Sequence, residues 1–248
     1  MIEISDLHKS YNGQAVLRGV NLHIKDGENL VVIGRSGGGK SVLLKHITGL
    51  IKPDSGKIVI DGTDMVPLNE NQLVPFRRQM GLLFQSAALF DSMTVSENVG
   101  FPLKEQRNLS VTEIEEKVAE ALEIVGLAGT QKKMPSELSG GMRKRVGLAR
   151  AVICRPRYIL YDEPTTGLDP VVADSINNLI LQLGDRFDST AIAVTHDMKS
   201  AYKIADRIAM LHDGHILMVG TPDELQASKD PIVRKFITGT ADPQEIDF

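Results

Sequence analysis

The eight residues from Gly34 to Ser41 constrain the fold of this chain more than any other segment. They fit the pattern G-x-x-x-x-G-K-[ST], and they lie between an apolar run at 29–34 and a helix expected at 40–50. A continuous apolar run is typical of a strand that is covered on both faces of a sheet. A glycine-rich loop between such a strand and a helix lets consecutive backbone N–H groups face a phosphate. The sequence therefore predicts an α/β fold with a phosphate-binding loop.

A second apolar run, at 158–161, ends directly in Asp162 and Glu163. An acidic pair alone is commonly a solvated strand end, but four bulky residues before this pair and a phosphate loop elsewhere favour a catalytic site. With Lys40 neutralising phosphate oxygens and Ser41 ligating Mg²⁺, we expect Asp162 to hold the rest of the Mg²⁺ shell. We expect Glu163 to activate the attacking water as a general base.

A second turn suited to anion binding precedes the helix that is expected after Ser139. The segment reads Leu-Ser-Gly-Gly-Met. A helix that starts at such a turn offers free backbone N–H groups, a hydroxyl and the positive end of its dipole. Ser139, Gly140 and Gly141 are therefore candidate phosphate ligands. The basic trio at 143–145 is expected to be a solvated helix face, which is the usual position of a charge run.

The remaining pattern predicts a helical segment inserted into a sheet protein. Alternating polar and apolar residues indicate antiparallel strands near the N-terminus, and a capping-box match at 110–113 opens a helix. An Asp-Gly turn predicts a hairpin after the last parallel strand. We expect a single domain with a core at 1–86 and 157–221, a helical insert at about 87–156 and a tail at 222–248. The strands are expected at 2–4, 15–17, 20–24, 29–34, 57–60, 158–161, 191–195, 207–211 and 215–219.

Composition disfavours several classes of protein. The chain has 28 Lys and Arg residues against 32 Asp and Glu residues, whereas a dedicated nucleic-acid binder usually carries a basic excess, so we expect no nucleic-acid partner. Cys154 is the one cysteine, which excludes an internal disulfide, and its apolar neighbours favour a packed thiol. No run approaches about 18 apolar residues and no signal peptide is apparent. We therefore expect any membrane role to come through a partner.

Taken together, these motifs resemble the ATP-binding cassette ATPases. The phosphate loop, Gln85, LSGGM, YILYDE, Asp169 and His196 occur in the order of that family, and the resemblance covers about residues 1–220. It implies a RecA-like P-loop core with an N-terminal antiparallel β region and an inserted helical subdomain. It also implies an enzyme that couples ATP hydrolysis to transport, with ATP and Mg²⁺ bound between two copies of the chain.

The resemblance implies a role for each matching residue. Tyr11 stacks on adenine, Gln85 touches Mg²⁺ and senses a membrane partner, and His196 contacts the γ-phosphate. Taken singly, each of these three also fits an ordinary strand or surface residue, but their joint order favours the functional roles. Lys40, Glu163 and His196 form the catalytic set. The implied ATP ligands within one chain are Tyr11, Gly34, Arg35, Ser36, Gly37, Gly38, Gly39, Lys40, Ser41, Val42, Gln85 and Asp162, and those offered to the second copy are Ser139, Gly140, Gly141, Met142 and Asp169.

Two departures from the family pattern are informative. Val42 stands where Ser or Thr normally follows the phosphate loop, so a hydroxyl near the α-phosphate is lost and a modest loss of affinity is expected. Met142 stands where the family normally has Gln. The LSGGM variant and the segments 81–90 and 98–103 are similar to the MlaF-type ATPases of phospholipid transport systems built around MCE-domain proteins.

This narrower resemblance implies partners and a location. It implies a multi-pass permease dimer of the MlaE type, two copies of the ATPase at the cytoplasmic face of the inner membrane, and an MCE-domain protein reached through the permease. Leu89, Phe90 and Met93 suit a groove for a permease helix, or else ordinary packing against the helical insert. The tail from Phe236 to Phe248 resembles the start of an extension that grips the neighbouring ATPase, or else is a frayed terminus.

Two other functions remain open from the sequence. One is the ATPase of a small-solute importer, for example for polar amino acids. The other is a non-transport scaffold ATPase resembling the SufC-like protein of iron–sulfur assembly. Met142 and the tail favour lipid transport, whereas soluble partners that co-purify without detergent would favour the scaffold.

Overall fold

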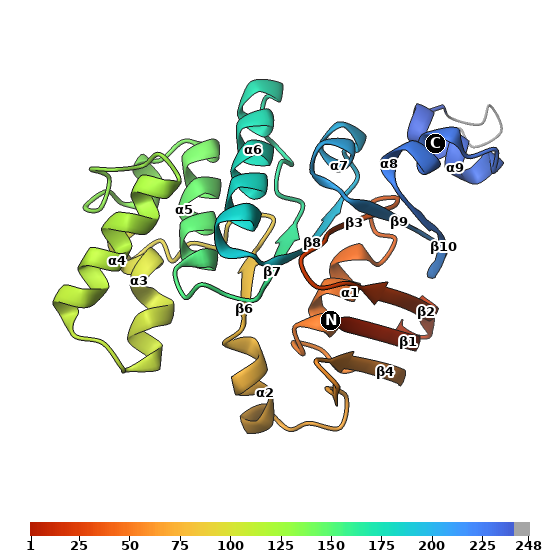
Figure 1. Cartoon of the computed structure of the whole chain (residues 1–248), viewed down its shortest axis with the longest axis horizontal. Coiled ribbons are helices and arrows are strands. Elements are labelled where there is room, and N and C mark those ends of the chain that lie inside the picture. Colours follow the sequence, from red (N-terminus) through yellow and green to blue (C-terminus); the bar gives the residue numbers. More distant parts are fainter. Residues whose placement is uncertain (241–248) are drawn as a thin grey trace.

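The chain folds around a six-stranded sheet and a separate four-stranded sheet, as a computed structural model of residues 1–240 shows (Figure 1). The six-stranded sheet has the order β10-β9-β3-β8-β7-β6, and its pairs are parallel except for the β9–β10 hairpin. Its strands are β3 (Asn29–Ile33), β6 (Met80–Leu83), β7 (Tyr158–Asp162), β8 (Thr190–Thr195), β9 (Arg207–His212) and β10 (His215–Gly220).

The four-stranded sheet is antiparallel, with the order β2-β1-β4-β5. Its strands are β1 (Ile2–Tyr11), β2 (Gln14–Ile24), β4 (Ser55–Ile60) and β5 (Thr63–Asp64). The two strands expected at 15–17 and 20–24 are one strand, because Gly19 takes a left-handed φ of 87° as a bulge between Leu17 and Val20. The ladder with β1 therefore continues past the residue that looked like a break.

Helices cover both faces of the larger sheet, and three of them form a lobe at the left of Figure 1. This lobe comprises α3, α4 and α5, which pack on one another. The predicted capping box is confirmed: the Ser110 hydroxyl accepts from the Glu113 N–H and the Glu113 carboxylate accepts from the Ser110 N–H. The helices are α1 (Lys40–Ile47), α2 (Glu70–Arg77), α3 (Val95–Gln106), α4 (Val111–Ile124), α5 (Gly140–Val152), α6 (Pro170–Phe187), α7 (Met198–Ile204), α8 (Pro222–Ala227) and α9 (Pro231–Thr238), with a 3₁₀ turn at Pro135–Glu137.

Helix α1 ends three residues before the expected position. The Thr48 hydroxyl donates back to the carbonyl oxygens of Leu44 and Lys45, and Gly49 takes a φ of 67°. A left-handed glycine is a common helix terminator because it has no Cβ to resist that conformation. At the N-terminal end of the helix, Gly39 is the N-cap residue, with a φ of 96°. Residues 241–248, and with them most of the predicted gripping tail, lie outside the described part of the chain.

The strand β3 is buried on both faces, as its continuous apolar run predicted. Val31 and Ile33 join the cluster that packs under α3–α7, whereas Leu30 and Val32 join a second cluster with α1 and the antiparallel sheet. Strands β3, β7 and β8 run parallel, so their carboxyl ends meet at one edge of the sheet. Ligands of open α/β sheets bind at that edge.

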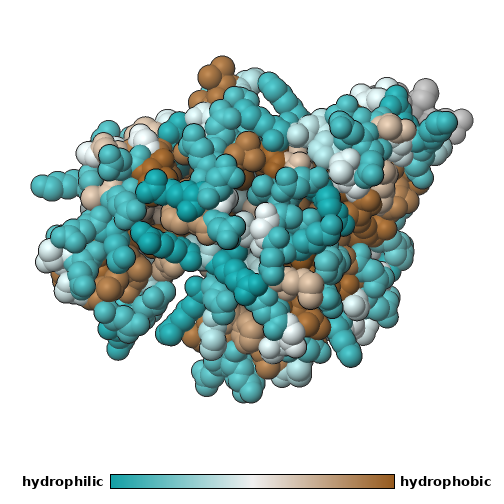
Figure 2. All heavy atoms as spheres, viewed as in Figure 1, coloured by the Kyte–Doolittle hydropathy of each residue, from teal (hydrophilic) through white to brown (hydrophobic). Residues whose placement is uncertain are grey.

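The surface is mostly polar. In Figure 2 teal atoms cover most of this face and brown atoms gather in separate small areas. No helix within residues 1–240 is long and apolar enough to cross a membrane.

Candidate functional site

The phosphate loop joins β3 to α1 and folds around its own lysine. Lys40 is only 5% exposed, and its ammonium donates to the carbonyl oxygens of Gly34 at 2.9 Å and Arg35 at 3.1 Å. Gly34 is required by packing: a Cβ on it would lie 2.4 Å from the Leu211 carbonyl oxygen. The loop therefore holds a positive charge inside a curl of backbone at the carboxyl end of β3.

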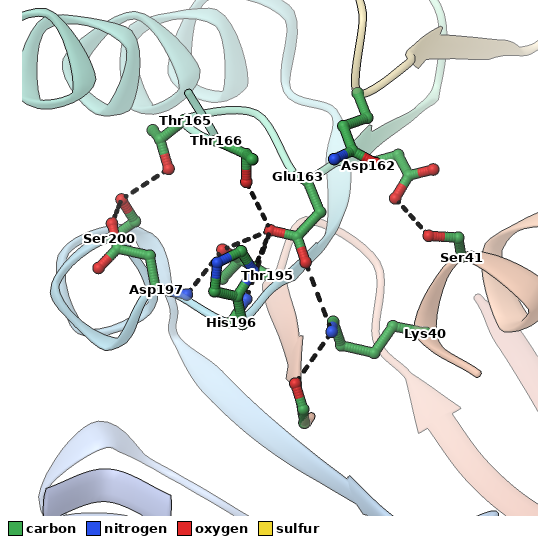
Figure 3. A network of polar contacts seen from close by, with 12 residues as sticks. Lys40, Ser41, Asp162, Glu163, Thr165, Thr166, Thr195, His196, Asp197 and Ser200 are labelled. Carbon is green, nitrogen blue, oxygen red and sulfur yellow. Dashed lines mark hydrogen bonds and ion pairs between the residues drawn. The ribbon is translucent and has the colours of Figure 1, made fainter. Parts of the chain in front are cut away.

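Glu163 follows β7 and lies at the centre of the polar network in Figure 3. Its Oε1 lies 3.4 Å from Lys40 Nζ, and its Oε2 lies 2.9 Å from His196 Nδ1. The hydroxyls of Thr166 and Thr195 also donate to Oε2, at 3.0 and 3.2 Å. Lys40, Glu163 and His196, which are at least 33 residues apart in the sequence, thus meet at one point.

The surroundings of Glu163 keep its carboxylate charged. Burial would raise its pKa, but the hydrogen bond from His196, the charges of Lys40 and His196, and the Thr166 hydroxyl outweigh burial and lower the pKa. The backbone of Glu163 takes a φ of 48°, a left-handed conformation that costs a non-glycine residue on the order of 1–3 kcal/mol. Such strain persists where surrounding contacts over-determine the backbone, and it occurs often at active sites.

Ser41 and Asp162 pair a hydroxyl with a carboxylate beside this network. Ser41 Oγ donates to Asp162 Oδ1 at 2.7 Å. Gln85 is exposed and lies two residues beyond the end of β6, the strand that pairs with β7. These oxygen donors are of the kind that Mg²⁺ prefers. Residues 1–240 contain no cluster of three or more His, Cys, Asp or Glu side chains arranged for a metal.

The Leu-Ser-Gly-Gly-Met turn lies elsewhere on the surface. Ser139 caps α5 by accepting from the Met142 N–H at 3.3 Å, and both Ser139 and Gly140 are exposed. Asp169 caps α6 by accepting from the N–H groups of Val171 and Val172, each at 3.0 Å. The starts of these helices are neighbours, since a Cβ on Gly141 would lie 2.6 Å from the Val172 side chain. Within residues 1–240 no hydrogen bond or ion pair joins Ser139, Gly140 or Gly141 to Lys40, Ser41 or Glu163.

The predicted solvated face at 143–145 is wrong for Lys144 and Arg145, whereas Arg143 is exposed. Lys144 is only 5% exposed, and its ammonium donates to the carbonyl oxygens of Gln85 at 2.6 Å and Glu163 at 2.9 Å. Burial lowers the pKa of Lys144 to about 8, although the charges of Asp162 and Glu163 raise it. Arg145 donates to the Val125 carbonyl oxygen and to Ser175 Oγ. The charge-run rule failed because loop carbonyls, which lie far away in the sequence, accept these donors.

Sequence reasoning missed Lys144, Thr166 and Thr195 as members of this site. A signal for Lys144 was present, because it lies three, four and seven residues before the buried Gly147, Leu148 and Ala151. That spacing places it on the buried stripe of α5. The two threonine hydroxyls carried no comparable signal, since Thr is common at the end of a strand.

Tyr11 ends β1 and is 43% exposed, with the Lys9 ammonium 5.4 Å from its ring centroid. The antiparallel sheet reaches the phosphate loop through β2: a Cβ on Gly39 would lie 3.1 Å from the side chains of Val16 and Leu17. Val42 is half-buried in α1. The ring of Tyr11 is thus an open aromatic face on the sheet that packs against the loop.

A groove of about 660 Å³ lies between α2 and the helical lobe. Phe90 and Phe101 line it with their ring centroids 5.0 Å apart, and Phe90 is 43% exposed. Leu89 instead packs against the core cluster, so the ordinary-packing interpretation holds for this residue, whereas Phe90 lies at a groove. Cys154 also lines the groove, and burial raises the pKa of its thiol, as expected of a packed cysteine. Figure 2 shows the surface hollowed between these two parts.

Comparison with known proteins supports the family that the motifs indicate. Residues 17–166 match the family model described as ABC transporter. The chain is 43% identical over 238 residues to the probable ribonucleotide transport ATP-binding protein mkl of Mycobacterium leprae, covering 96% of this chain and 69% of that protein. It is 38% identical over 242 residues to the intermembrane phospholipid transport system ATP-binding protein MlaF of Escherichia coli, covering 98% of this chain and 90% of MlaF.

A solved structure extends the likeness to the fold. The dimeric post-hydrolysis structure of the ATP-binding cassette MJ0796 bound to ADP and Pi superposes with a TM-score of 0.83. It is 33% identical and covers 90% of this chain and 99% of the cassette. The predicted fold class, a P-loop core with an antiparallel β region and an inserted helical subdomain, is confirmed.

Proposed function

This chain belongs to the ABC transporter family, and from that premise we propose that it is the ATP-hydrolysing subunit of a transporter that moves phospholipid between membranes. The observation that carries the catalytic part is the meeting of Lys40, Glu163 and His196 at the carboxyl edge of the sheet. This arrangement supplies one cation and one imidazole for phosphate oxygens and one carboxylate for a water. Phosphoryl transfer needs these parts and little else from the protein.

In the proposed mechanism, ATP replaces some of the contacts that Lys40, Glu163 and His196 make with one another in the structure. The phosphate loop binds the β- and γ-phosphates, and Lys40 moves its charge from Glu163 to their oxygens. His196 turns to the γ-phosphate, which leaves Glu163 Oε2 to accept a proton from water. The water oxygen bonds to the γ-phosphorus as the bond to the β–γ bridging oxygen breaks, and ADP and phosphate leave. Tyr11 stacks on the adenine.

Ser41, Asp162 and Gln85 are the residues that would hold Mg²⁺. When bound, the ion neutralises charge on the phosphate oxygens. The hydrogen bond between Ser41 and Asp162 supports this assignment, because it brings a hydroxyl and a carboxylate from different elements together beside the loop.

A second copy of the chain completes each site. The exposed turn of Ser139, Gly140 and Gly141 offers N–H groups and a helix dipole end to an anion that its own chain does not place there. Met142 and Asp169, at the same pair of helix starts, extend this face. Two copies joined head to tail would each lend this turn to the other's ATP, and hydrolysis would let them part.

The test of the catalytic assignment is Glu163→Gln. This variant should bind ATP with unchanged affinity and hydrolyse it about 10²–10⁴-fold more slowly, which is the usual contribution of a general base. With ATP present it should form a stable dimer in light scattering. Unaltered turnover, or a variant that stays monomeric with ATP both alone and with its membrane partner, would overturn the assignment.

The lipid cargo and the partners rest on the likeness to MlaF and on Met142. The groove of Phe90 and Phe101, beside Gln85, suits a short apolar segment of a multi-pass permease. An MCE-domain protein would attach through that permease, and the chain would sit at the cytoplasmic face of the inner membrane. The tail beyond Gly239 would grip the second copy, so deleting it should weaken assembly.

Purification of the tagged chain from detergent-solubilised membranes tests these partners. Co-purification of a permease with an MCE-domain protein would support phospholipid transport. A permease with a soluble solute-binding protein would instead support an importer, and soluble partners recovered without detergent would support a scaffold ATPase. Either of the last two results would overturn the lipid proposal while leaving the ATPase assignment intact.

A further inference from the structure

Lys144 connects three parts of the site through one ammonium group. It lies in α5, five residues after the Ser139 cap, and is almost fully buried. It donates to the carbonyl oxygen of Gln85 at 2.6 Å and to that of Glu163 at 2.9 Å. One cation therefore joins the exposed turn at the head of α5, the loop after β6 and the carboxylate-bearing residue after β7.

Burying an ammonium group among carbonyl oxygens has a high desolvation free energy for a contact that only joins loops. Removing a charge from water is unfavourable unless it is well compensated, and among residues 1–240 no carboxylate forms an ion pair with Lys144. A neutral side chain would be easier to bury at this position. A charged group retained in such a place is a candidate for function.

The contact with Glu163 fixes the peptide group that follows the proposed base. The Glu163 N–H donates to the Val194 carbonyl oxygen at 2.9 Å, and the Glu163 carbonyl oxygen accepts from Lys144. Between these bonds the residue holds its left-handed φ of 48°. Lys144 thus helps to fix the peptide group after Glu163, together with the Thr166 N–H, which donates to the same carbonyl oxygen at 3.4 Å.

Through its contact with Gln85, Lys144 is also connected to the groove that Phe90 and Phe101 line. Strands β6 and β7 are paired neighbours, with Leu83 opposite Tyr161, so the two carbonyls that Lys144 holds lie just beyond adjacent strand ends. The loop that contains Gln85 also contains Phe84 and leads to Phe90, and both phenylalanines line the groove. A displacement of this loop by a partner, or of α5 by a second copy, would move the ammonium that holds Glu163.

We propose that Lys144 is a positioning residue that orients Glu163 for hydrolysis and transmits movement of the Gln85 loop and of α5 to it. This inference rests on the proposed function of Glu163 as the base. It assigns Lys144 no contact with ATP. Its effect should therefore fall on turnover and on stimulation by the membrane partner, and leave nucleotide affinity unchanged.

Arg145, the next residue, is a matched structural control. It donates to the Val125 carbonyl oxygen at 2.7 Å and to Ser175 Oγ at 2.8 Å, so it also joins α5 to other elements through its cation. These contacts lead to the end of α4 and to α6, and none of them involves Gln85 or Glu163. A substitution of Arg145 should weaken the packing of α5 without releasing the base.

The experiment compares Lys144→Met, Lys144→Arg and Arg145→Met in the full chain, purified in complex with its membrane partner. We expect Lys144→Met to lower kcat by about 10- to 100-fold, because a misplacement of about 1 Å costs a rate of that order, with the KM for ATP unchanged. Stimulation of ATPase by the partner should be lost. Lys144→Arg should restore much of kcat, whereas Arg145→Met should lower the melting temperature and keep kcat per folded complex.

Two outcomes would overturn the inference. One is a Lys144→Met complex with the kcat and the partner stimulation of the unmodified complex. The other is a loss that Arg145→Met reproduces, or that appears as a raised KM alone. If Lys144→Met does not fold, Lys144→Gln replaces it with the same expectation. Glu163→Gln separates the two proposals: if it keeps full turnover, both fail, whereas an inactive Glu163→Gln beside a fully active Lys144→Met refutes only the role of Lys144.

Discussion

The two glycine-rich turns of this chain each begin a helix, yet they differ in how much of their surroundings the chain supplies. The phosphate loop before α1 encloses Lys40, which is buried and lies beside Glu163, and its Ser41 is bonded to Asp162. The turn before α5 is exposed, and within residues 1–240 the Ser139 hydroxyl bonds only inside its own turn, to the Met142 N–H. The first turn is thus surrounded by side chains of its own chain, whereas the second leaves the same backbone chemistry exposed.

This difference shows that similar sequence patterns need not be equivalent sites. Both turns present free N–H groups at a helix N-terminus. Only the phosphate loop lies at the edge where β3, β7 and β8 end, and so only it receives Asp162, Glu163 and His196 as neighbours. Variants at the two turns can separate what each of them contributes.

The largest effect should come from complexes that mix two variants, Lys40→Ala and Ser139→Arg. If each ATP uses the phosphate loop of one copy and the Ser139 turn of the other, a complex with one variant in each copy keeps one intact site. A complex with both substitutions in one copy and none in the other keeps no intact site. We therefore expect measurable ATPase from the first complex and background activity from the second, using two affinity tags to purify each mixture.

The same pairs also define what would contradict this arrangement. Background activity from the first complex and measurable activity from the second would mean that both turns serve one nucleotide within a single chain. Complexes in which both copies carry Lys40→Ala give the background rate. ATP binding to isolated Ser139→Arg chains should be unchanged, because the exposed turn makes no contact with the phosphate loop of its own chain.

The next prediction compares stability and turnover in two variants, Gly34→Ala and Gly140→Ala, which each add one methyl group to one of the turns. A Cβ at Gly34 would lie 2.4 Å from the Leu211 carbonyl oxygen, whereas a Cβ at Gly140 would lie 3.5 Å from the Leu168 side chain, an ordinary contact. Gly34→Ala should therefore lower the free energy of unfolding by about 1–3 kcal/mol. Gly140→Ala should keep or slightly raise it, because alanine favours the helix.

Turnover should follow a different order in these two variants. Gly140→Ala should lower the ATPase rate by about tenfold or more in the assembled complex, because the methyl group stands where a phosphate must approach the backbone. Chemical unfolding and steady-state ATPase on the same preparations make the comparison. A Gly140→Ala complex with an unchanged rate would show that this turn has no phosphate against it.

The parts of this fold that the sequence predicted are those set by local pattern. The buried strand β3, the capping box of α4 and the β9–β10 hairpin each follow from residues a few positions apart, and the structure confirms all three. The long helix α6 was not predicted, although Asp169 and Pro170 are a typical cap and first residue. The family resemblance assigns Asp169 to the face offered to a second copy, and the cap of α6 is an additional, local role of its side chain.

The candidate site also has residues that local sequence pattern predicts and residues that it does not. Asp162 and Glu163 lie at a recognisable strand end and Lys40 lies in a recognisable loop motif after β3, so their convergence follows from the parallel sheet. Lys144 could not be placed by local pattern, because its partners are two backbone carbonyls 59 and 19 residues away. Any residue type supplies a carbonyl, so nothing in the sequence marks the acceptors of a buried cation. The hydroxyls of Thr166 and Thr195 donate to the Glu163 carboxylate, and they were missed because a single threonine carries no local signal for such a contact.

A smaller effect is expected from Ser200→Ala, which tests how the loops around Glu163 are held in the complete half of the site. Ser200 is buried in α7; its hydroxyl donates to Asp197 at 2.6 Å and accepts from the Asn177 amide at 2.8 Å. It also lies 3.2 Å from the Thr165 hydroxyl, as Figure 3 shows. Thus it connects the loop after Glu163 with the loop after His196.

Loss of this hydroxyl leaves a buried amide without its acceptor, which should destabilise the chain by about 1–3 kcal/mol. Turnover should fall only a few-fold, since Lys40 and His196 still contact Glu163. Thermal unfolding and ATPase assays test both statements, with Ser200→Cys as the variant of similar volume. A turnover loss as large as that of Glu163→Gln would mean that Ser200 belongs to the catalytic set.

The smallest effect should come from Val42→Thr, which restores the hydroxyl that the phosphate loop lacks relative to its family. Valine and threonine have nearly the same shape, and Val42 is half-buried, so the new hydroxyl needs no repacking of α1. One added hydrogen bond is worth about 0.5–1.5 kcal/mol, so the Kd for ATP should fall by roughly 2- to 13-fold. Equilibrium binding of a fluorescent ATP analogue measures the change, with Val42→Ala as the control that removes volume and adds no donor.

Because Lys40, Glu163 and His196 keep their contacts, kcat should stay unchanged. If Val42→Thr and Val42→Ala bind ATP with equal affinity, then the side chain at position 42 lies away from the nucleotide, and the missing hydroxyl has no effect on this loop.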